Sequence, residues 1–276
     1  MTNSVHTNTA AAIALQNLSR TTSNLNETQN RVSTGLKVQG AKDNASIWAI
    51  AQQQRAETSA LGAVKSSLDR ATSIADVALT AGESVSDLLK ELKEKIVAQD
   101  VSLRTQSRTI LNEDFKALLR AIDSAVDNAA FDGSNILNGS LTFGIQFLAN
   151  ADATASITLS AKNLSVSGGV ITLTNTDNIL TPTAAAQALS RLDTSMNQVN
   201  IALGAIGSQA KQIEAHNVFV SKLMDSLEAG VGNLVDADLA KESARLQALQ
   251  VQQQLGAQAL SIANQAPQII LSLFRN

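Results

Sequence analysis

The 276-residue chain contains no cysteine and no tyrosine, only two prolines, and 3% aromatic residues. Without cysteine it can form no disulfide, no reactive thiolate and no cysteine-based metal site. Because so few prolines interrupt the chain, long helices can run unbroken. Hydrophobic residues make up 44% of the sequence, so a core is possible, and it must be built mainly from Leu, Ile, Val and Ala. The length suits about two ordinary domains.

Charge is also scarce, at 16% charged residues and a net charge of −3. A surface that binds nucleic acid must be basic, so nucleic acid is not expected as the main partner. The N-terminus has no basic-then-apolar signal sequence, and no stretch has the composition of a membrane span. Taken alone, these features suggest a cytoplasmic protein, although a chain exported by a dedicated secretion machine would share them.

The C-terminal region combines apolar residues with glutamine. Residues 246–274 carry no charged side chain, and eight of these twenty-nine residues are glutamine, which argues against burial in a bilayer. Two rows step by three and four residues, as one helix face does. The first row is Leu246, Leu249, Gln253, Gly256, Leu260 and Ala263. The second row is Ala248, Gln252, Leu255, Ala259, Ile262, Ala266, Ile269 and Leu273. They lie on roughly opposite faces, so we expect both to be buried, partly by copies of the same chain.

The N-terminal region is similar in kind, because Arg20 is the only fully charged residue between Met1 and Asn26. Over residues 5–36 a row with heptad-like spacing predicts a helix. The row is Ala11, Leu15, Leu18, Thr22, Leu25, Gln29, Val32 and Leu36.

Two further segments have long heptad patterns. The pattern over residues 44–98 predicts a helix about 80 Å long at 1.5 Å per residue. A shorter helix is expected after it. Thr181 and Pro182 then provide a hydroxyl N-cap followed by proline at the first helical position. The row that follows reaches Leu227, and Asn217, its only strongly polar member, could set the register.

Between residues 138 and 181 the pattern changes to alternation, with Ser and Thr enriched and turns expected at Asn138-Gly139 and Gly168-Gly169. Short strands are expected around Leu141 to Phe147 and at later alternating pairs. We therefore predict a mainly α fold, a nested antiparallel long-helix bundle. Its terminal helices form a coiled-coil pair, and a small β insertion faces outward and should be replaceable by a short Gly-Ser link.

Residues 31–45 closely resemble the N-terminal signature of bacterial flagellins, and the C-terminal region resembles their C-terminal signature. The matching positions in the first are Arg31, Ser33, Gly35, Leu36, Ala41, Lys42, Asp43 and Ala45. Those in the second are Asp236, Asp238, Gly256, Asn264, Gln265, Pro267 and Gln268. The sequence departs from the family at Trp48, where a small or polar residue is usual, and in its short middle region.

This resemblance implies a flagellin of the short, two-shell type with a small central insert, a structural subunit that self-assembles into the flagellar filament for motility. In that family the ends are disordered in the monomer and form an inner helical tube on assembly. The implied divisions are a terminal domain (1–43 with 232–276), a long-helix domain (44–140 with 181–231) and an outer insert (141–180). We expect subunit packing by Leu15, Leu18, Leu25, Val32, Leu36, Leu246, Leu249, Leu255, Leu260, Ile262 and Ile269.

The resemblance also implies partners and a location. The chain would be secreted by the flagellar type III export apparatus with an export chaperone. Outside the cell it would become part of the filament, a homo-oligomer of identical or sibling subunits, in contact with hook-associated and cap proteins. Neither nucleic acid nor membrane is expected. The alternatives are a hook–filament junction protein, whose C-terminal motif usually diverges more, and an unrelated coiled-coil adhesin or membrane-active protein.

An enzyme is the least favoured interpretation, and we expect no catalytic, cofactor or metal site. His6 and His216 are the only histidines, and His216 is expected on the surface. Asp236 and Asp238 are expected to cap a helix or pair with Lys241 rather than bind metal.

A toll-like receptor senses many flagellins through an arginine and, one turn later, a leucine on the long helix. Ungapped alignment from Ala41 places Glu91 and Lys95 at these positions, where they could also pair with each other. The resemblance therefore implies weak receptor activation.

Overall fold

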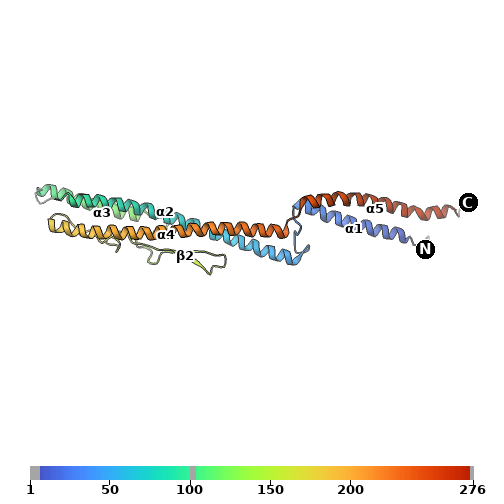
Figure 1. Cartoon of the computed structure of the whole chain (residues 1–276), viewed down its shortest axis with the longest axis horizontal. Coiled ribbons are helices and arrows are strands. Elements are labelled where there is room, and N and C mark those ends of the chain that lie inside the picture. The colour runs from blue at the N-terminus through green and yellow to red at the C-terminus, as the bar shows by residue number, and fades with distance from the viewer. Residues whose placement is uncertain (1–6, 100–103, 274–276) are drawn as a thin grey trace. The chain divides into compact units, whose positions relative to one another are not determined.

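The computed structural model describes residues 7–99 and 104–273, with side chains described as far as residue 265 (Figure 1). The elements in these ranges are helices α1 (Thr9–Thr34), α2 (Ala45–Val97) and α3 (Thr105–Asp127), strands β1 (Ile145–Leu148) and β2 (Ser156–Leu159), and helices α4 (Pro182–Val235) and α5 (Leu239–Leu273). The expected mainly α fold with a small β insertion is confirmed.

The chain folds into two compact units. The first unit contains Met1–Ala56 and Ser226–Asn276, and the second contains Glu57–Asp225. The two ends of the chain therefore belong to one unit and enclose the other in sequence. Residues 141–180 group with the long helices in the second unit, and the three-part division predicted from the sequence stays a prediction.

The first unit contains the α1/α5 pair and a small apolar cluster beside it. Val38, Ala51, Val231 and Val235 are buried in this cluster. Trp48, the residue that departs from the flagellin pattern, packs against it as a partly buried side chain. The tryptophan therefore adds apolar surface to a core that has few large residues.

The second unit is built on α2 and α4, which run antiparallel. Lys65 on α2 pairs with Asn217 on α4 at 3.2 Å, and Lys93 pairs with Asp193 at 2.8 Å, so the partner's number falls as the α2 number rises. The predicted heptad row is buried along α2 from Leu61 to Ile96. Asn217 also donates to Asp69, and these bonds from a single seam position favour one register.

The sequence signals at the start of α4 act as expected. Pro182 is the first helical residue, and the Thr181 hydroxyl oxygen accepts a hydrogen bond from the Ala184 N–H at 3.2 Å. The first N–H groups of a helix have no acceptor within the helix. Proline has no N–H to leave unpaired at this position, and the threonine hydroxyl accepts from one of the remaining N–H groups.

The insert contains one antiparallel strand pair, in which Ile145 lies opposite Leu159 and Leu148 opposite Ser156. The strand expected to begin at Leu141 is wrong, because the chain turns at Gly144 with φ of 83°. A Cβ there would lie 2.1 Å from the carbonyl oxygen of Leu159, so only glycine fits. The turn leaves Phe143 89% exposed, outside the strand.

The insert packs closely against the long helices, which argues against the expectation that a short link could replace it. Five of its aliphatic side chains have no exposed surface: Leu159, Leu164, Ile171, Leu173 and Ile179. Its backbone also bonds to both neighbouring helices. The N–H of Ile179 donates to Asn112 on α3 at 3.0 Å, and that of Thr172 donates to Ser195 on α4 at 2.9 Å. The segment thus completes the core of the second unit.

Candidate assembly surface

The N-terminal signature forms the connection between α1 and α2. Gly35 ends α1 in the left-handed conformation, with φ of 72°, and its N–H donates to the carbonyl of Arg31 at 2.9 Å. Its own carbonyl accepts from the Ala237 N–H at 2.8 Å, which ties this loop to the chain entering α5. A residue with a Cβ would be strained there, which explains the glycine physically.

The rest of that loop is held by Asp43. Its carboxylate accepts from the backbone N–H groups of Gln39 at 2.9 Å and Gly40 at 3.3 Å. Ala41, Lys42 and Asp43 are themselves exposed. Asp43 therefore stabilises the turn from within, and the signature serves local folding.

Arg31 links α1 to α5. Its guanidinium lies 2.5 Å from Glu27 on its own helix and 3.4 Å from Glu242 in the first turn of α5. Glu242 is only 8% exposed, and its Oε2 has no hydrogen-bond partner among the described residues. Sequence reasoning missed Glu242, although an acidic residue in the first turn of a helix is a recognisable favourable position.

Asp238 caps α5, which is one of the two roles expected for it from the sequence. One of its carboxylate oxygens accepts from the N–H groups of Ala240 at 3.0 Å and Lys241 at 3.1 Å. Asp236 has a different position, since its backbone forms a bridge with Leu36 across the two connecting segments. The cap explains the carboxylate of Asp238 without a ligand, whereas the backbone bridge fixes the position of Asp236 but does not require its side chain.

The two terminal helices pack antiparallel along the first of the two C-terminal rows. A Cβ on Gly256 would lie 3.3 Å from a methyl of Leu18, Gln253 donates to Thr22 at 3.2 Å, and Asn8 donates to the carbonyl of Ala263 at 2.7 Å. Leu249 is buried, and Leu246 and Leu260 are half-buried in the same row. This row is the seam of the helix pair within one chain.

The face of α1 that packs against α5 differs from the predicted row at every second member of that row. Thr21 and Thr28 are buried, with Leu18, Leu25 and Val32 half-buried beside them. The expected row used the residues one position later, Leu15 among them, but Leu15 is 57% exposed. Small side chains at the seam allow the two helices to approach closely, so the larger leucine points elsewhere.

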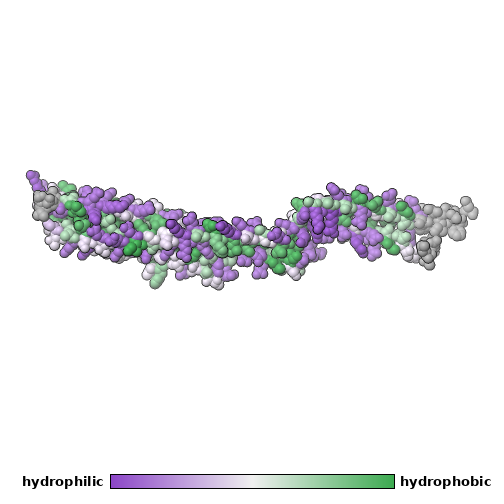
Figure 2. All heavy atoms as spheres, in the orientation of Figure 1, coloured by the Kyte–Doolittle hydropathy of each residue, from purple (hydrophilic) through white to green (hydrophobic). Residues whose placement is uncertain are grey.

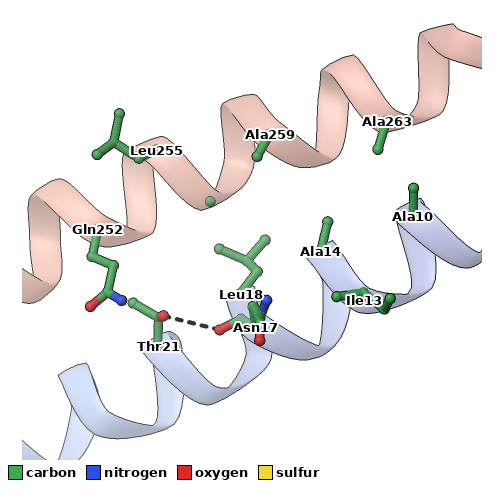
Figure 3. Close-up of a pocket in the computed structure, with 11 residues that line it drawn as sticks. Ala10, Ile13, Ala14, Asn17, Leu18, Thr21, Gln252, Leu255, Ala259 and Ala263 are labelled. Atoms are coloured by element: carbon green, nitrogen blue, oxygen red, sulfur yellow. Dashed lines mark hydrogen bonds between the residues drawn. The ribbon is translucent and has the colours of Figure 1, made fainter.

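The second C-terminal row stays open in the single chain. Its members lie one residue before those of the first row, so the two rows are about 100° apart around α5 and are not on the opposite faces expected from the sequence. Leu255 is 61% and Ile262 is 64% exposed, and Ala248, Gln252 and Ala259 of the same row are also exposed. A groove of about 820 Å³ runs beside it between α5 and α1, lined on the α1 side by residues from Ala10 to Thr21. Figure 3 shows Leu255 directed away from α1, whereas Leu18 points toward α5. Hydrophobic residues accordingly lie among hydrophilic ones on the surface of this helix pair (Figure 2).

A third face of α5 is polar without being charged. Its exposed members, spaced by three or four residues, are Gln247, Gln250, Gln254, Gln258, Ser261 and Gln265. We call this row the glutamine face. Five of the eight glutamines counted in the C-terminal region lie on this one face, and their spacing of three or four residues is the signal in the sequence that could have identified it.

The remaining predicted positions fall into two groups. Ser33, Ala45, Asn264 and Gln265 are exposed. The side chains of Pro267, Gln268 and Ile269 lie outside the described residues, so their predicted roles stay predictions.

The receptor-patch positions lie on α2. Glu91 is exposed and Lys95 half-buried. The suggested Glu91–Lys95 pair is wrong, because the Lys95 ammonium instead lies 3.0 Å from Asp114 on α3. Packing of α3 against α2 brings a closer carboxylate to Lys95.

His216 was expected on the surface, but it is half-buried and fastens the insert. Its Nε2 lies 2.7 Å from the carbonyl oxygen of Ala149, and its ring contacts Phe219. Among the described residues, no group of three or more His, Cys, Asp or Glu side chains could hold a metal ion. No helix in that part of the chain is long and apolar enough to span a bilayer.

Comparison with known proteins gives a consistent family. Residues 5–142 match the bacterial flagellin N-terminal helical region, and residues 189–274 match the bacterial flagellin C-terminal helical region. Flagellin FljJ of Caulobacter vibrioides is 54% identical, over 99% of this chain and 98% of that protein. A flagellin of Brucella melitensis is 39% identical over 99% of both.

Among solved structures, a flagellar hook-associated protein from Vibrio parahaemolyticus has a similar fold. It aligns with a TM-score of 0.57 and 16% identity, covering 70% of this chain and all of that one. At this identity the likeness concerns the fold alone.

Proposed function

The chain belongs to the bacterial flagellin family and is a structural subunit of the flagellar filament, and from this premise we propose which surfaces assemble it. Copies associate through the open row of α5, centred on Leu255 and Ile262, and through the groove between α5 and α1. The exposure of this uncharged apolar row is the observation that carries the proposal. The hook–filament junction and adhesin alternatives are not favoured, because flagellins match the chain over nearly its whole length.

Association is driven by removing this surface from water. Full burial of a leucine or isoleucine side chain contributes about 1.5–3 kcal/mol. Leu255 and Ile262 have about two-thirds of their surface still exposed, so each can contribute roughly 1–2 kcal/mol when a neighbouring copy covers it. A contact that repeats head-to-tail without closing produces a helical filament.

The glutamine face has a different role in the same proposal. Amide side chains bind water well but carry no charge, so a row of them suits a wet surface that must not attract ions strongly. We place this face toward the water-filled centre of the filament. The terminal helices, residues 1–43 and 232–276, would then form the inner tube, with residues 44–140 and 181–231 in the shell around it.

The proposal extends to secretion and to flagellar partners. Family membership supports export through the flagellar type III apparatus with an export chaperone, and contact with hook-associated and cap proteins at the filament's ends. The working location is then the extracellular filament.

Two changes on neighbouring faces of α5 test the assembly surface. Leu255→Asp should abolish polymerisation, since an unpaired buried carboxylate costs several kcal/mol. The matched control Gln258→Asp puts the same carboxylate on the glutamine face, where water can solvate it, and should still polymerise. Deleting residues 246–276 should leave a soluble, largely helical monomer. Sedimentation and electron microscopy measure filaments, and circular dichroism measures helix content.

The outcomes separate the parts of this proposal. Normal filaments from Leu255→Asp or from the truncated chain would contradict the assembly surface. Loss of filaments in Gln258→Asp alone would instead contradict the placement of the glutamine face toward water.

A further inference from the structure

A small apolar cluster in the first unit holds together the segment that follows α1 and the segment that precedes α5. Backbone bonds join these two segments. The carbonyl of Val235 accepts from the N–H groups of Lys37 at 2.7 Å and Val38 at 3.2 Å, and the carbonyl of Gly35 accepts from the Ala237 N–H at 2.8 Å. The side chains of the cluster are Leu36, Val38, Ile47, Trp48, Ala51, Val231, Leu234 and Val235. We call these side chains and the three backbone bonds the clasp.

Trp48 is the largest side chain of the clasp. The four buried members are only an alanine and three valines, and Trp48 is half-buried against them. In the second unit, by contrast, residues as large as Phe115, Leu89 and Leu159 are completely buried. Four small side chains gain little from burial, whereas an aromatic side chain brings a large apolar surface. The stability of the clasp therefore depends mainly on Trp48.

The clasp also brings the two terminal helices together at one end. Gly35 directly follows α1, and Ala237 lies just before α5, so their bond joins the end of one helix to the start of the other. With these ends held together, pairing of α1 with α5 no longer has to close a loop made of most of the chain, which lowers its entropic cost. The groove proposed for assembly is lined by both helices, so it exists only when they are paired. A closed clasp thus favours the assembly surface.

We propose that Trp48 is a positioning residue for assembly, which keeps the clasp closed in the free monomer and so forms the α1/α5 surface before a subunit reaches the filament. This inference rests on the proposed assembly surface. Only monomers with a closed clasp can then add to a filament, so the apparent affinity falls in proportion to their fraction. The small or polar residue usual at this position in flagellins would leave the clasp without its largest apolar contact.

The unchanged protein offers a direct measurement, because Trp48 is the only tryptophan in the chain. Below the critical concentration for polymerisation, acrylamide should quench the tryptophan fluorescence of the monomer much less than that of the urea-unfolded chain. Equal quenching in the two states would show that the clasp is open in the monomer and would overturn the proposal.

Trp48→Ser should open the clasp in most monomers. The backbone N–H groups of residues 35–38 should then exchange with solvent faster, because their bonds open more often. If about a tenth of the monomers keep a closed clasp, the critical concentration rises about tenfold. The main urea-unfolding transition, which comes from the larger second unit, should not move. Trp48→Phe keeps an aromatic side chain and should return the critical concentration to within about twofold of the unchanged protein.

The matched control is Ile50→Ser, which removes an apolar side chain two positions away on the same helix. Ile50 is 50% exposed and does not belong to the clasp. Its substitution should leave exchange at residues 35–38 unchanged and the critical concentration within about twofold of that of the unchanged protein.

A disulfide across the clasp separates positioning from a general loss of stability. Leu36 and Asp236 form an antiparallel bridge, and the Cα atoms of such a pair lie about 4.5–5.5 Å apart, within the range of a disulfide. The chain has no cysteine of its own, so Leu36→Cys with Asp236→Cys can form only this bond within one molecule. Added to Trp48→Ser, the oxidised form should polymerise at a concentration about tenfold lower than the reduced form, because the bond keeps the clasp closed.

The results distinguish this proposal from the assembly surface itself. If Trp48→Ser polymerises like the unchanged chain while Leu255→Asp does not polymerise, Trp48 is no positioning residue and the assembly surface stands. Equal critical concentrations of the oxidised and reduced forms would overturn the positioning role in the same way. If Leu255→Asp forms normal filaments, the assembly surface is contradicted, and the role of Trp48 with it.

Discussion

Replacing residues 141–180 with a short Gly-Ser link should unfold or severely loosen the second unit. Five aliphatic side chains in this segment are fully buried. Truncating one such side chain to alanine typically costs 2–5 kcal/mol, so losing five costs about 10 kcal/mol or more. That is comparable to the whole unfolding free energy of a typical domain, about 5–15 kcal/mol.

Two single substitutions calibrate this estimate. Leu173 has no exposed surface, and Leu173→Ala should lower the unfolding free energy by about 2–5 kcal/mol. Phe143 belongs to the same insert but is 89% exposed, so Phe143→Ala should change it by less than about 0.5 kcal/mol. Urea denaturation of the monomer followed by circular dichroism measures both. A link variant with the unfolding midpoint of the unchanged chain, or equal effects of the two substitutions, would refute the reasoning.

Two other predictions concern α4 and α2. Ser195 is fully buried and accepts a hydrogen bond from the Thr172 N–H, so Ser195→Ala should lower the unfolding free energy by about 1–3 kcal/mol in the same assay. The control Thr194→Ala changes an exposed neighbour and should leave the unfolding free energy almost unchanged. Similar losses of unfolding free energy in the two variants would argue against a docked insert. Monomeric protein should activate the toll-like receptor weakly, and Glu91→Arg with Lys95→Leu should partly restore activation in a reporter-cell assay, because the pair supplies an arginine anchor and an apolar contact. Activation by the unchanged protein at the level of an arginine- and leucine-bearing flagellin would contradict this.

The positions of the long helices follow from local signals. The predicted helix over residues 44–98 is found as Ala45–Val97, and α4 begins at Pro182 as expected. Both depend on near neighbours in sequence: the heptad spacing, the threonine cap and the proline after it. The flagellin signatures were also readable, and part of their role is local: the Gly35 N–H donates to Arg31, and Asp238 accepts from the start of α5. The bond from Ala237 to the Gly35 carbonyl is long-range and came only from the structure.

Less local features were mispredicted. The alternating residues from Leu141 predicted a strand, but Gly144 turns the chain under the carbonyl of Leu159, fifteen residues later. The insert was interpreted as polar and outward-facing because its Ser and Thr content masks a few aliphatic residues. Only packing against α3 and α4 makes those residues part of the core.

The sequence by itself determined the periodic helices, the two-faced C-terminal end and the family, since each is encoded in residue spacing. Tertiary structure decided which face each helix shows to its partner. On α1, rows one residue apart fit a heptad pattern almost equally well, and contact with α5 selects the row with Thr21 and Thr28 over that with Leu15. On α5 the same contact covers Leu249 and leaves Leu255 exposed. A helix with more than one usable face has no preferred partner surface until another helix packs against it.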